Sequence, residues 1–270
     1  MNKAEIGHII YEQLLENKEV LKQQFLNSKK DIGYFYIDNL LPKNLALEIF
    51  EKFPSTEETV KRKSLKEYKF TAFQMNQYNS LLEEVIYAFQ DEKVIKLVAE
   101  ICDLKNIYGD EFLYAGGLSL MKKDNFLNPH LDNSHDKDRS RWRVLNLLYY
   151  TTPNWELENG GNLELWPNGL KEDPITILSK FNRLVVMTTH QKSWHSVSKV
   201  AKDATRCCIS NYYFSDEPIL ESDSFHVTTF RGRSSEKVKD VILQVDNNLR
   251  SGLRKIFKKG VRENPHQYKK

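Results

Sequence analysis

The chain has 270 residues, of which 40% are hydrophobic and 29% charged, and its formal net charge is +3. These values are ordinary for a globular protein, and they exclude a collagen-like, coiled-coil or disordered chain. No apolar run approaches the roughly 18 residues of a membrane-spanning helix, and residues 1–6 lack the apolar core of a signal peptide, so we expect a cytoplasmic location with no membrane span.

The first hundred residues predict helices around one strand. Apolar residues spaced among charges in 4–26 indicate an amphipathic helix, and the aromatic, β-branched run 33–38 indicates a strand. Pro42 then opens a short helix, and residues 91–102 have one apolar side, which is typical of another helix.

From residue 111 the pattern changes to short apolar or alternating runs separated by turn residues. Such runs predict strands at 112–121, 143–151, 162–166, 174–178, 183–188, 195–200 and 205–214. Many short strands at this spacing favour an antiparallel barrel or a jelly roll. The three cysteines, Cys102, Cys207 and Cys208, have no metal-site spacing, and we expect them to be small buried side chains.

The last segment returns to helical spacing. Residues 236–257 carry an apolar stripe, and residues 231–270 hold 12 Lys/Arg against 4 Asp/Glu, a balance of +8. We expect a helix packed on the barrel with a solvated basic face. A membrane or nucleic-acid patch is the alternative, but no aromatics interleave the lysines, so no nucleic-acid partner is expected.

A histidine and a carboxylate two residues apart form the first chemical signal. On a strand, His130 and Asp132 would project from one face, and His195 lies in a later strand-like run. Two histidines and one carboxylate are the facial triad of non-heme Fe(II) oxygenases. His190 is a rival to His195, while His135 is better explained as a solvated loop residue.

An arginine on an inward strand face forms the second signal. Arg206, Cys208, Ser210 and Tyr212 share one face of their strand. An inward arginine is costly unless it meets an anion, and a carboxylate suits its planar fork. Ser210 can donate a further hydrogen bond to the same group.

Several motifs in this order resemble a known family. They are His130-Leu131-Asp132-Asn133, Leu148-Tyr149-Tyr150 with Trp155, residues 160–167, residues 181–185, His195-Ser196-Val197, and Ala204-Thr205-Arg206 leading to Tyr212-Tyr213-Phe214. Residues 130–214 resemble the core of the 2-oxoglutarate/Fe(II)-dependent dioxygenases, and the oxygen-sensing prolyl hydroxylases in particular. The resemblance extends weakly to residues 34–42.

The resemblance implies a mainly β fold with flanking helices around a double-stranded β-helix, or jelly roll. The dioxygenase domain would span residues 31–220, between an N-terminal helical segment at 1–30 and a basic helical extension at 221–270 packed on the core. It also implies that His130, Asp132 and His195 bind iron, and that a second set binds 2-oxoglutarate: Arg206, Tyr150, Ser210 and Leu163. Arg206 lies 11 residues after His195, two more than in close relatives, so the hairpin at 199–203 is expected to be longer.

The sequence gives fewer indications of which residues contact the substrate. Asn146 shares the parity of Tyr150 and is expected to face inward, whereas Arg143 has the opposite parity and is expected at the rim. Trp166 could wall the pocket, although a core aromatic is the preferred interpretation. The polar loop 133–142 could close over a substrate.

The implied activity is hydroxylation of an unactivated C–H bond with release of succinate and CO₂. Its cofactors would be Fe(II), 2-oxoglutarate and O₂, with ascorbate as reductant. The substrate would be a small molecule or a peptidyl side chain such as that of proline. The N- and C-terminal helices could shape a groove for a peptide, or they could mediate a homodimer. The alternatives are a non-catalytic jelly-roll binding module and a non-oxidative metal-dependent cupin enzyme, which needs no buried arginine.

Overall fold

A computed structural model describes residues 1–114, 116–256 and 266–269. Its helices are α1 (Lys3–Glu16), α2 (Lys18–Ser28), α3 (Lys43–Glu51), α4 (Ser80–Ala88), α5 (Glu92–Ile101) and α6 (Lys237–Ile256). Its first strands are β1 (Tyr34–Asp38), β2 (Val60–Lys63), β3 (Glu67–Ala72), β4 (Ile107–Tyr108), β5 (Gly117–Met121), β6 (Phe126–Leu131) and β7 (Trp142–Tyr150). The others are β8 (Leu163–Leu165), β9 (Ile175–Ile177), β10 (Arg183–Thr188), β11 (His195–Val197), β12 (Arg206–Ser215) and β13 (Thr229–Phe230).

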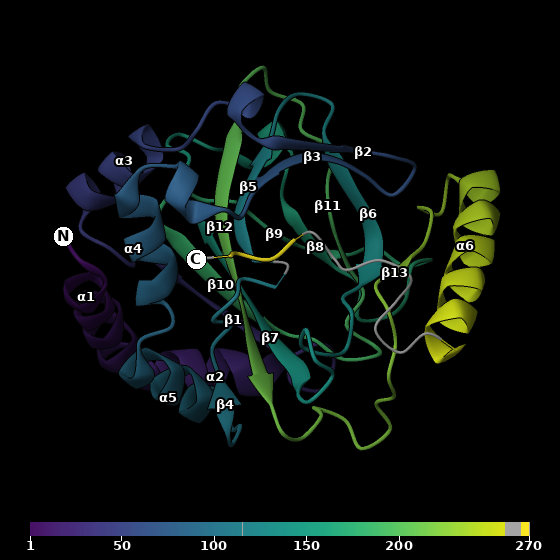
Figure 1. Ribbon diagram of the computed structural model, residues 1–270, viewed down its shortest axis with the longest axis horizontal. Coiled ribbons are helices and arrows are strands. Elements are labelled where there is room, and N and C mark those ends of the chain that lie inside the picture. The colour runs from purple at the N-terminus through teal and green to yellow at the C-terminus, as the bar shows by residue number, and fades with distance from the viewer. Residues whose placement is uncertain (115, 257–265, 270) are drawn as a thin grey trace.

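The strands form one antiparallel sheet that curls on itself, which confirms the predicted jelly-roll class. Its order is β1-β10-β7-β12-β5-β3-β6-β11-β8-β9, with β13 added to β6, β2 to β3 and β4 to β12. Figure 1 shows β7 and β12 crossing the middle of the molecule, with β6, β8 and β11 to their right, on the side of α6. Residues of β5, β6, β7, β8, β11 and β12 line one shared pocket, so the curled sheet encloses it.

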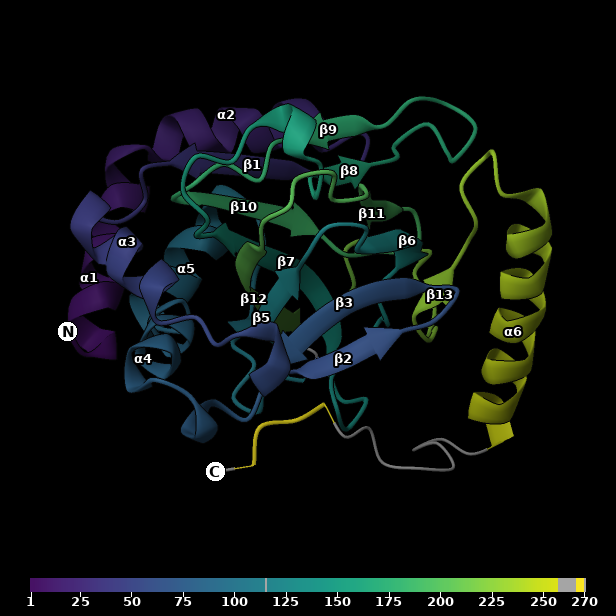
Figure 2. The same cartoon turned by 90° about the horizontal axis from the view of Figure 1, so that it is seen from above.

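Successive side chains along each strand point to opposite faces of the sheet. Leu147 and Tyr149 of β7 pack in the main core with apolar residues of α1, α4 and α5, whereas Leu148 and Tyr150 point to the inner face. Figure 2 shows these helices gathered on one side of the sheet. The outer face therefore carries the hydrophobic core, and the inner face is left for the pocket.

Most predicted elements are confirmed, but the N-terminal helix is two helices. The chain bends at Asn17, which separates α1 from α2. The Asn17 side chain donates to the Gln13 carbonyl at 2.9 Å, a local bond of the kind that competes with helix continuation. The predicted strand at 112–121 is also shorter, since only β5 forms there. The three cysteines are free and buried, as expected.

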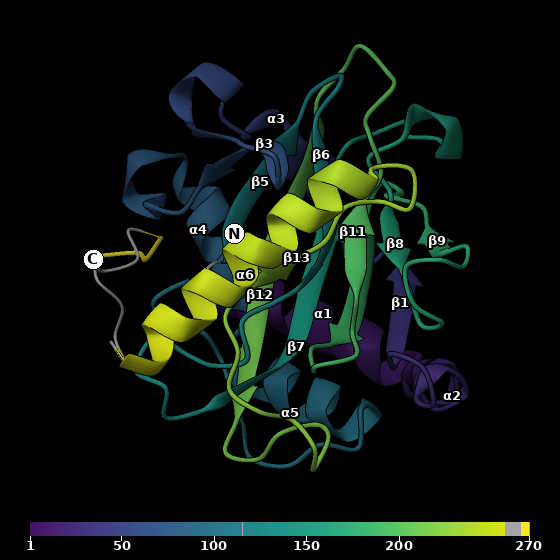
Figure 3. The same ribbon diagram turned by 90° about the vertical axis from the view of Figure 1, so that its right-hand side faces the viewer.

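The C-terminal helix forms where expected, but its apolar stripe does not pack on the barrel. α6 stands at the end of the molecule opposite α1–α5 and lies over β13 (Figures 2 and 3). Six stripe residues are 49–77% exposed: Val238, Val241, Ile242, Val245, Leu249 and Leu253. Polar contacts orient the helix instead, because Asp240 accepts two hydrogen bonds from Arg231, and Asn247 bonds the backbone of Phe230. Among the described residues, no helix is long and apolar enough to cross a membrane.

Candidate metal centre and pocket

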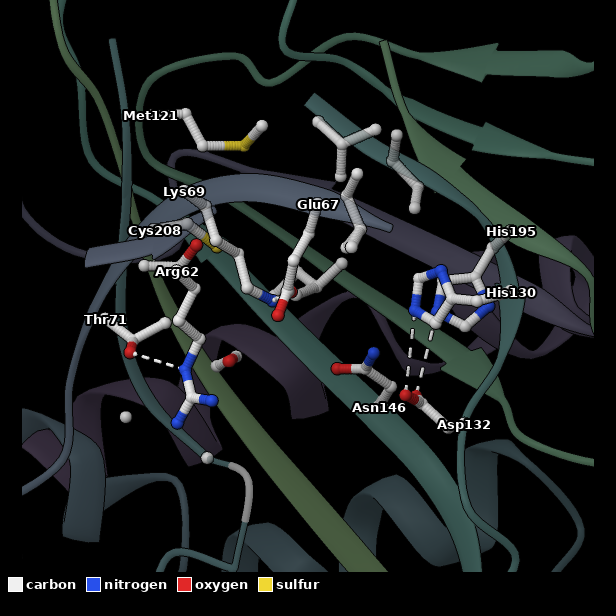
Figure 4. Close-up of a pocket in the computed structure, with 18 of the residues that line it drawn as sticks. Arg62, Glu67, Lys69, Thr71, Met121, His130, Asp132, Asn146, His195 and Cys208 are labelled. Atoms are coloured by element: carbon white, nitrogen blue, oxygen red, sulfur yellow. Dashed lines mark hydrogen bonds and ion pairs between the residues drawn. The ribbon is translucent and has the colours of Figure 1, made fainter. Parts of the chain in front are cut away.

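Three side chains predicted from the sequence converge at one point. His195 on β11 pairs directly with His130 at the end of β6, and Asp132 follows two residues later. The Asp132 carboxylate oxygens lie 3.7 Å from Nε2 of His130 and 3.7 Å from Nε2 of His195. All three side chains are buried, and one ligand atom from each lies within 4.8 Å of the others (Figure 4).

Backbone carbonyls fix the tautomer of both imidazoles. Nδ1 of His130 lies 3.0 Å from the Asn128 carbonyl, and Nδ1 of His195 lies 2.9 Å from the Ser193 carbonyl. Because a carbonyl can only accept, Nδ1 must carry the proton, which leaves a lone pair on each Nε2. This arrangement is typical of histidines that bind a metal through Nε2.

The charge state of the cluster suits a cation. Burial lowers the pKa of His130 to about 3, so this imidazole is neutral at physiological pH. Burial opposes ionisation of Asp132, but nearby positive charge, to which Arg143 contributes, outweighs it and lowers the pKa of the carboxyl. Oδ2 of Asp132 is buried and has no hydrogen-bond partner among the described residues. An ionised, unsatisfied carboxylate between two lone pairs fits a bound metal ion.

The triad opens into a pocket of about 260 Å³. Met121 and Leu127, which the sequence did not single out, line it together with Leu148 and with the predicted Leu163, Ser210, Tyr212 and Cys208. Arg206 lines the pocket too, as the shared strand face predicts. Such a wall limits access of water to the centre.

Arg206 is a buried cation, 2% exposed, without a carboxylate partner in the described part of the chain. Its Nε donates to the Ser179 hydroxyl at 3.2 Å, and its guanidinium lies 4.8 Å from the ring centre of Tyr150. The Tyr150 hydroxyl is buried with no hydrogen-bond partner among the described residues, and burial raises its pKa to about 12, so it remains a donor. A buried arginine beside a free hydroxyl donor fits a carboxylate ligand.

Asn146 faces the pocket as expected, but the expectation for Arg143 is wrong. Arg143 is 2% exposed and lines the pocket. The pairing of β7 with β12 shifts between Tyr213 and Phe214, which places Phe214 opposite Arg143 and leaves Val144 as the extra residue of a β-bulge. A bulge reverses the alternation that follows it, so Arg143 turns inward.

Three other aromatic side chains lie outside the pocket lining. Trp166 is buried and donates to the Ser196 hydroxyl at 2.8 Å, which fits the core interpretation. His190 lies in a separate small cavity that Asp132 also borders. His135 is buried against Phe225, with ring centres 4.4 Å apart, so it is not the solvated loop residue expected.

The pocket also includes residues that the sequence analysis did not single out. Arg62, Glu67 and Lys69 come from β2 and β3, His266 comes from the C-terminal segment, and Phe230 stacks on His130 at 5.2 Å. Residues 67–70 alternate charged and aromatic side chains, but residues 61–63 are three consecutive cations, so the sequence gives only a weak hairpin signal for the first three. The position of His266 depends on tertiary structure alone.

Comparisons with known proteins agree with this geometry. The sequence profile of the 2OG-Fe(II) oxygenase superfamily matches residues 116–214. No curated protein matches the chain in sequence.

Solved structures share the fold at low identity. A prolyl-4-hydroxylase from Pseudomonas putida is 15% identical, with a TM-score of 0.53 over 72% of this chain and 98% of that one. A prolyl hydroxylase from Trichoplax adhaerens, solved with a hypoxia inducible factor peptide, is 19% identical, with a TM-score of 0.51 over 78% and 96%. A non-heme alpha ketoglutarate dependent epimerase of nogalamycin biosynthesis is 12% identical, with a TM-score of 0.53 over 73% and 84%. Residues 116–214 are thus similar in sequence to the 2OG-Fe(II) oxygenase superfamily, and the curled sheet and the His-Asp-His cluster agree with that similarity.

Proposed function

We propose that this oxygenase is a hydroxylase that couples 2-oxoglutarate and O₂ to oxidation of an unactivated C–H bond. The observation that carries the proposal is that His130, Asp132 and His195 meet in the same pocket as the buried Arg206, which has no carboxylate partner in the described ranges. A non-catalytic module has no need to keep both groups, and a cupin enzyme has no need of the arginine.

The three side chains of the triad would hold Fe(II) through two neutral imidazoles and one carboxylate. When bound, iron supplies the oxidising chemistry that, with 2-oxoglutarate and O₂, gives a hydroxylated product, succinate and CO₂. The protein keeps Nε2 of each histidine unprotonated through its backbone contacts and keeps Asp132 ionised.

The same pocket would bind 2-oxoglutarate. Arg206 would pair with its distal carboxylate, and the Tyr150 hydroxyl would donate to the same group. Ser210 and Leu163 also line the pocket, so one could donate a hydrogen bond and the other could exclude water. Asn146 and Arg143, both buried next to the triad, would contact the substrate, which would be a small molecule or a peptidyl side chain such as proline.

Replacement of Asp132 tests the metal centre directly. We expect Asp132→Ala to reduce succinate release with Fe(II), ascorbate and 2-oxoglutarate at least about a hundredfold, because one of three ligands is lost. The iron content after reconstitution should fall as well, while the circular dichroism spectrum stays unchanged.

Asp124→Ala is the matched control, since the Asp124 side chain is 62% exposed and pairs only with Lys199 among the described residues. Full turnover by Asp132→Ala would refute the ligand assignment. Turnover by the wild type without 2-oxoglutarate would favour the cupin alternative.

A further inference from the structure

The charges that line the pocket do not balance one another. Arg62, Lys69, Arg143 and Arg206 contribute four cations, whereas Glu67 and Asp132 contribute two anions. Lys69 pairs with Glu67 at 3.1 Å, and Arg143 lies 4.0 Å from Asp132. Arg206 is assigned to 2-oxoglutarate by the proposed function. Arg62 remains. Glu67 interacts with its charge at longer range, but no carboxylate of the described residues lies within ion-pairing distance of it.

Neutral partners hold Arg62 in place. Its Nε donates to the Thr71 hydroxyl at 3.2 Å, and its Nη2 donates to Nδ1 of His266 at 3.2 Å. His266 is oriented in turn, because its Nε2 donates to the Gly116 carbonyl at 2.7 Å and its ring stacks on Phe73 at 4.3 Å. Burial lowers the pKa of His266 to about 3, which keeps this imidazole a neutral acceptor. Two of the five N–H donors of the guanidinium are used in these bonds, and the other three have no partner among the described residues.

Arg62 and the triad face each other across the pocket. Figure 4 shows Arg62 and Thr71 on one side, His130, His195 and Asp132 on the other, and Asn146 beside Asp132. A ligand bound at Arg62 can therefore extend toward the triad.

Unsatisfied polar atoms lie beside the triad. Nε of Arg143 and Oδ1 of Asn146 have no hydrogen-bond partner among the described residues, although their side chains are only 2% and 3% exposed. Buried polar groups are nearly always satisfied, so these two atoms point to a polar ligand.

We propose that the substrate carries an anionic group, a carboxylate or a phosphate, that binds to Arg62, while its polar atoms near the reacting C–H contact Asn146 and Arg143. The inference rests on the proposed function of the same pocket and specifies its substrate class. A positive wall opposite the metal centre selects an anion by charge as well as by hydrogen bonds.

A panel of matched compounds tests the proposal. It contains small carboxylic acids with their primary amides, and sugar phosphates with their parent sugars, and the two arms separate carboxylate from phosphate. Binding to the metal-free protein is measured by calorimetry, and succinate release is measured above the rate without substrate. We expect only anionic members to bind and to stimulate succinate release.

Arg62→Gln should weaken this binding at least about tenfold, because a charge-assisted hydrogen-bond pair is lost. Lys61→Gln is the matched control, since it removes the same charge from the neighbouring position of β2, outside the pocket lining. The KM for 2-oxoglutarate should be equal in all three proteins.

Three results would overturn the proposal: neutral compounds that stimulate as well as their anionic partners, wild-type affinity in Arg62→Gln, or a panel without an anionic binder. Failure of the proposed function is distinguishable, because it would abolish 2-oxoglutarate decarboxylation in the wild type while anion binding to the metal-free protein persists.

Discussion

The Asp110 carboxyl is buried, and its burial opposes ionisation. It is 4% exposed, and its Oδ2 has no hydrogen-bond partner in the described part of the chain. Burial raises its pKa to about 6, despite backbone hydrogen bonds near Tyr114 and the charge of Arg143, which both lower it. The neutral form is therefore preferred in the folded protein up to about pH 6.

The raised pKa of Asp110 predicts a pH-dependent stability. Between its unfolded value of about 4 and its folded value of about 6, the folded state binds more protons, so the free energy of unfolding falls as pH rises. The total loss is about 3 kcal/mol, since each pKa unit corresponds to about 1.4 kcal/mol. Asp110→Asn should lack this loss. Urea denaturation of both metal-free proteins from pH 4 to 7 measures the difference, and parallel curves would contradict the prediction.

At the residue scale, the sequence predicted the metal ligands better than the other residues that line the pocket. His130, Asp132 and His195 were found because metal ligands require particular residue types in a recognisable order. Arg143 was misplaced because strand parity assumes a regular ladder, and the bulge at Val144 depends on pairing with β12. Arg62 was missed because it belongs to no motif, and only the curl of the sheet brings it to the pocket.

At the element scale, the turn before β8 supports the binding site. Gly160 and Gly161 both have positive φ, 69° and 66°. A Cβ on Gly161 would lie 3.0 Å from Cδ of Arg206, so the turn leaves room for the arginine to lie along the pocket. The sequence motif indicated a turn here, but its contact with Arg206 follows only from the fold.

This contact predicts that Gly161→Ala weakens binding of 2-oxoglutarate. The added methyl group should displace Arg206, and we expect the KM for 2-oxoglutarate to rise about tenfold, because charge-assisted hydrogen bonds depend on geometry. Gly169→Ala is the control: its φ is also positive, at 86°, but no atom lies within 4 Å of the added Cβ. Both variants carry similar backbone strain, so an equal change in KM would show that strain, and not Arg206, is responsible.

The elements that the sequence predicted are those with a strong local pattern. β7, β10 and β12 are long, apolar and bounded by turn residues, and they formed as expected. The hairpin β2–β3 was missed because its strands are polar and partly exposed, which weakens the period-2 signal. The hairpin is stabilised instead by the pairing of β3 with β5 and β6, which a local sequence pattern does not reveal.

At the scale of the whole molecule, two different kinds of packing hold the helices. α1, α4 and α5 bury many apolar residues against the sheet, whereas α6 buries Leu243 and otherwise attaches through ion pairs and side-chain hydrogen bonds. The sequence located the apolar stripe of α6 but could not tell which face of the helix meets the barrel. Specific partners on β13 and the segment after it decide this, because they bind Asn247 and Asp240.

We therefore predict that polar residues, and not the stripe, anchor α6. Asp240→Ala removes both hydrogen bonds to Arg231 and the one to the Gly232 backbone, so local opening of residues 237–256 should become easier by about 1–2 kcal/mol. Hydrogen exchange of these amides measures the change, which should appear as at least about fivefold faster exchange in α6, with β7 and β12 unaffected. Val245→Gln is the control, because the Val245 side chain is 54% exposed and its replacement should leave exchange in α6 unchanged. Faster exchange in Val245→Gln with none in Asp240→Ala would show instead that the apolar stripe holds the helix in place.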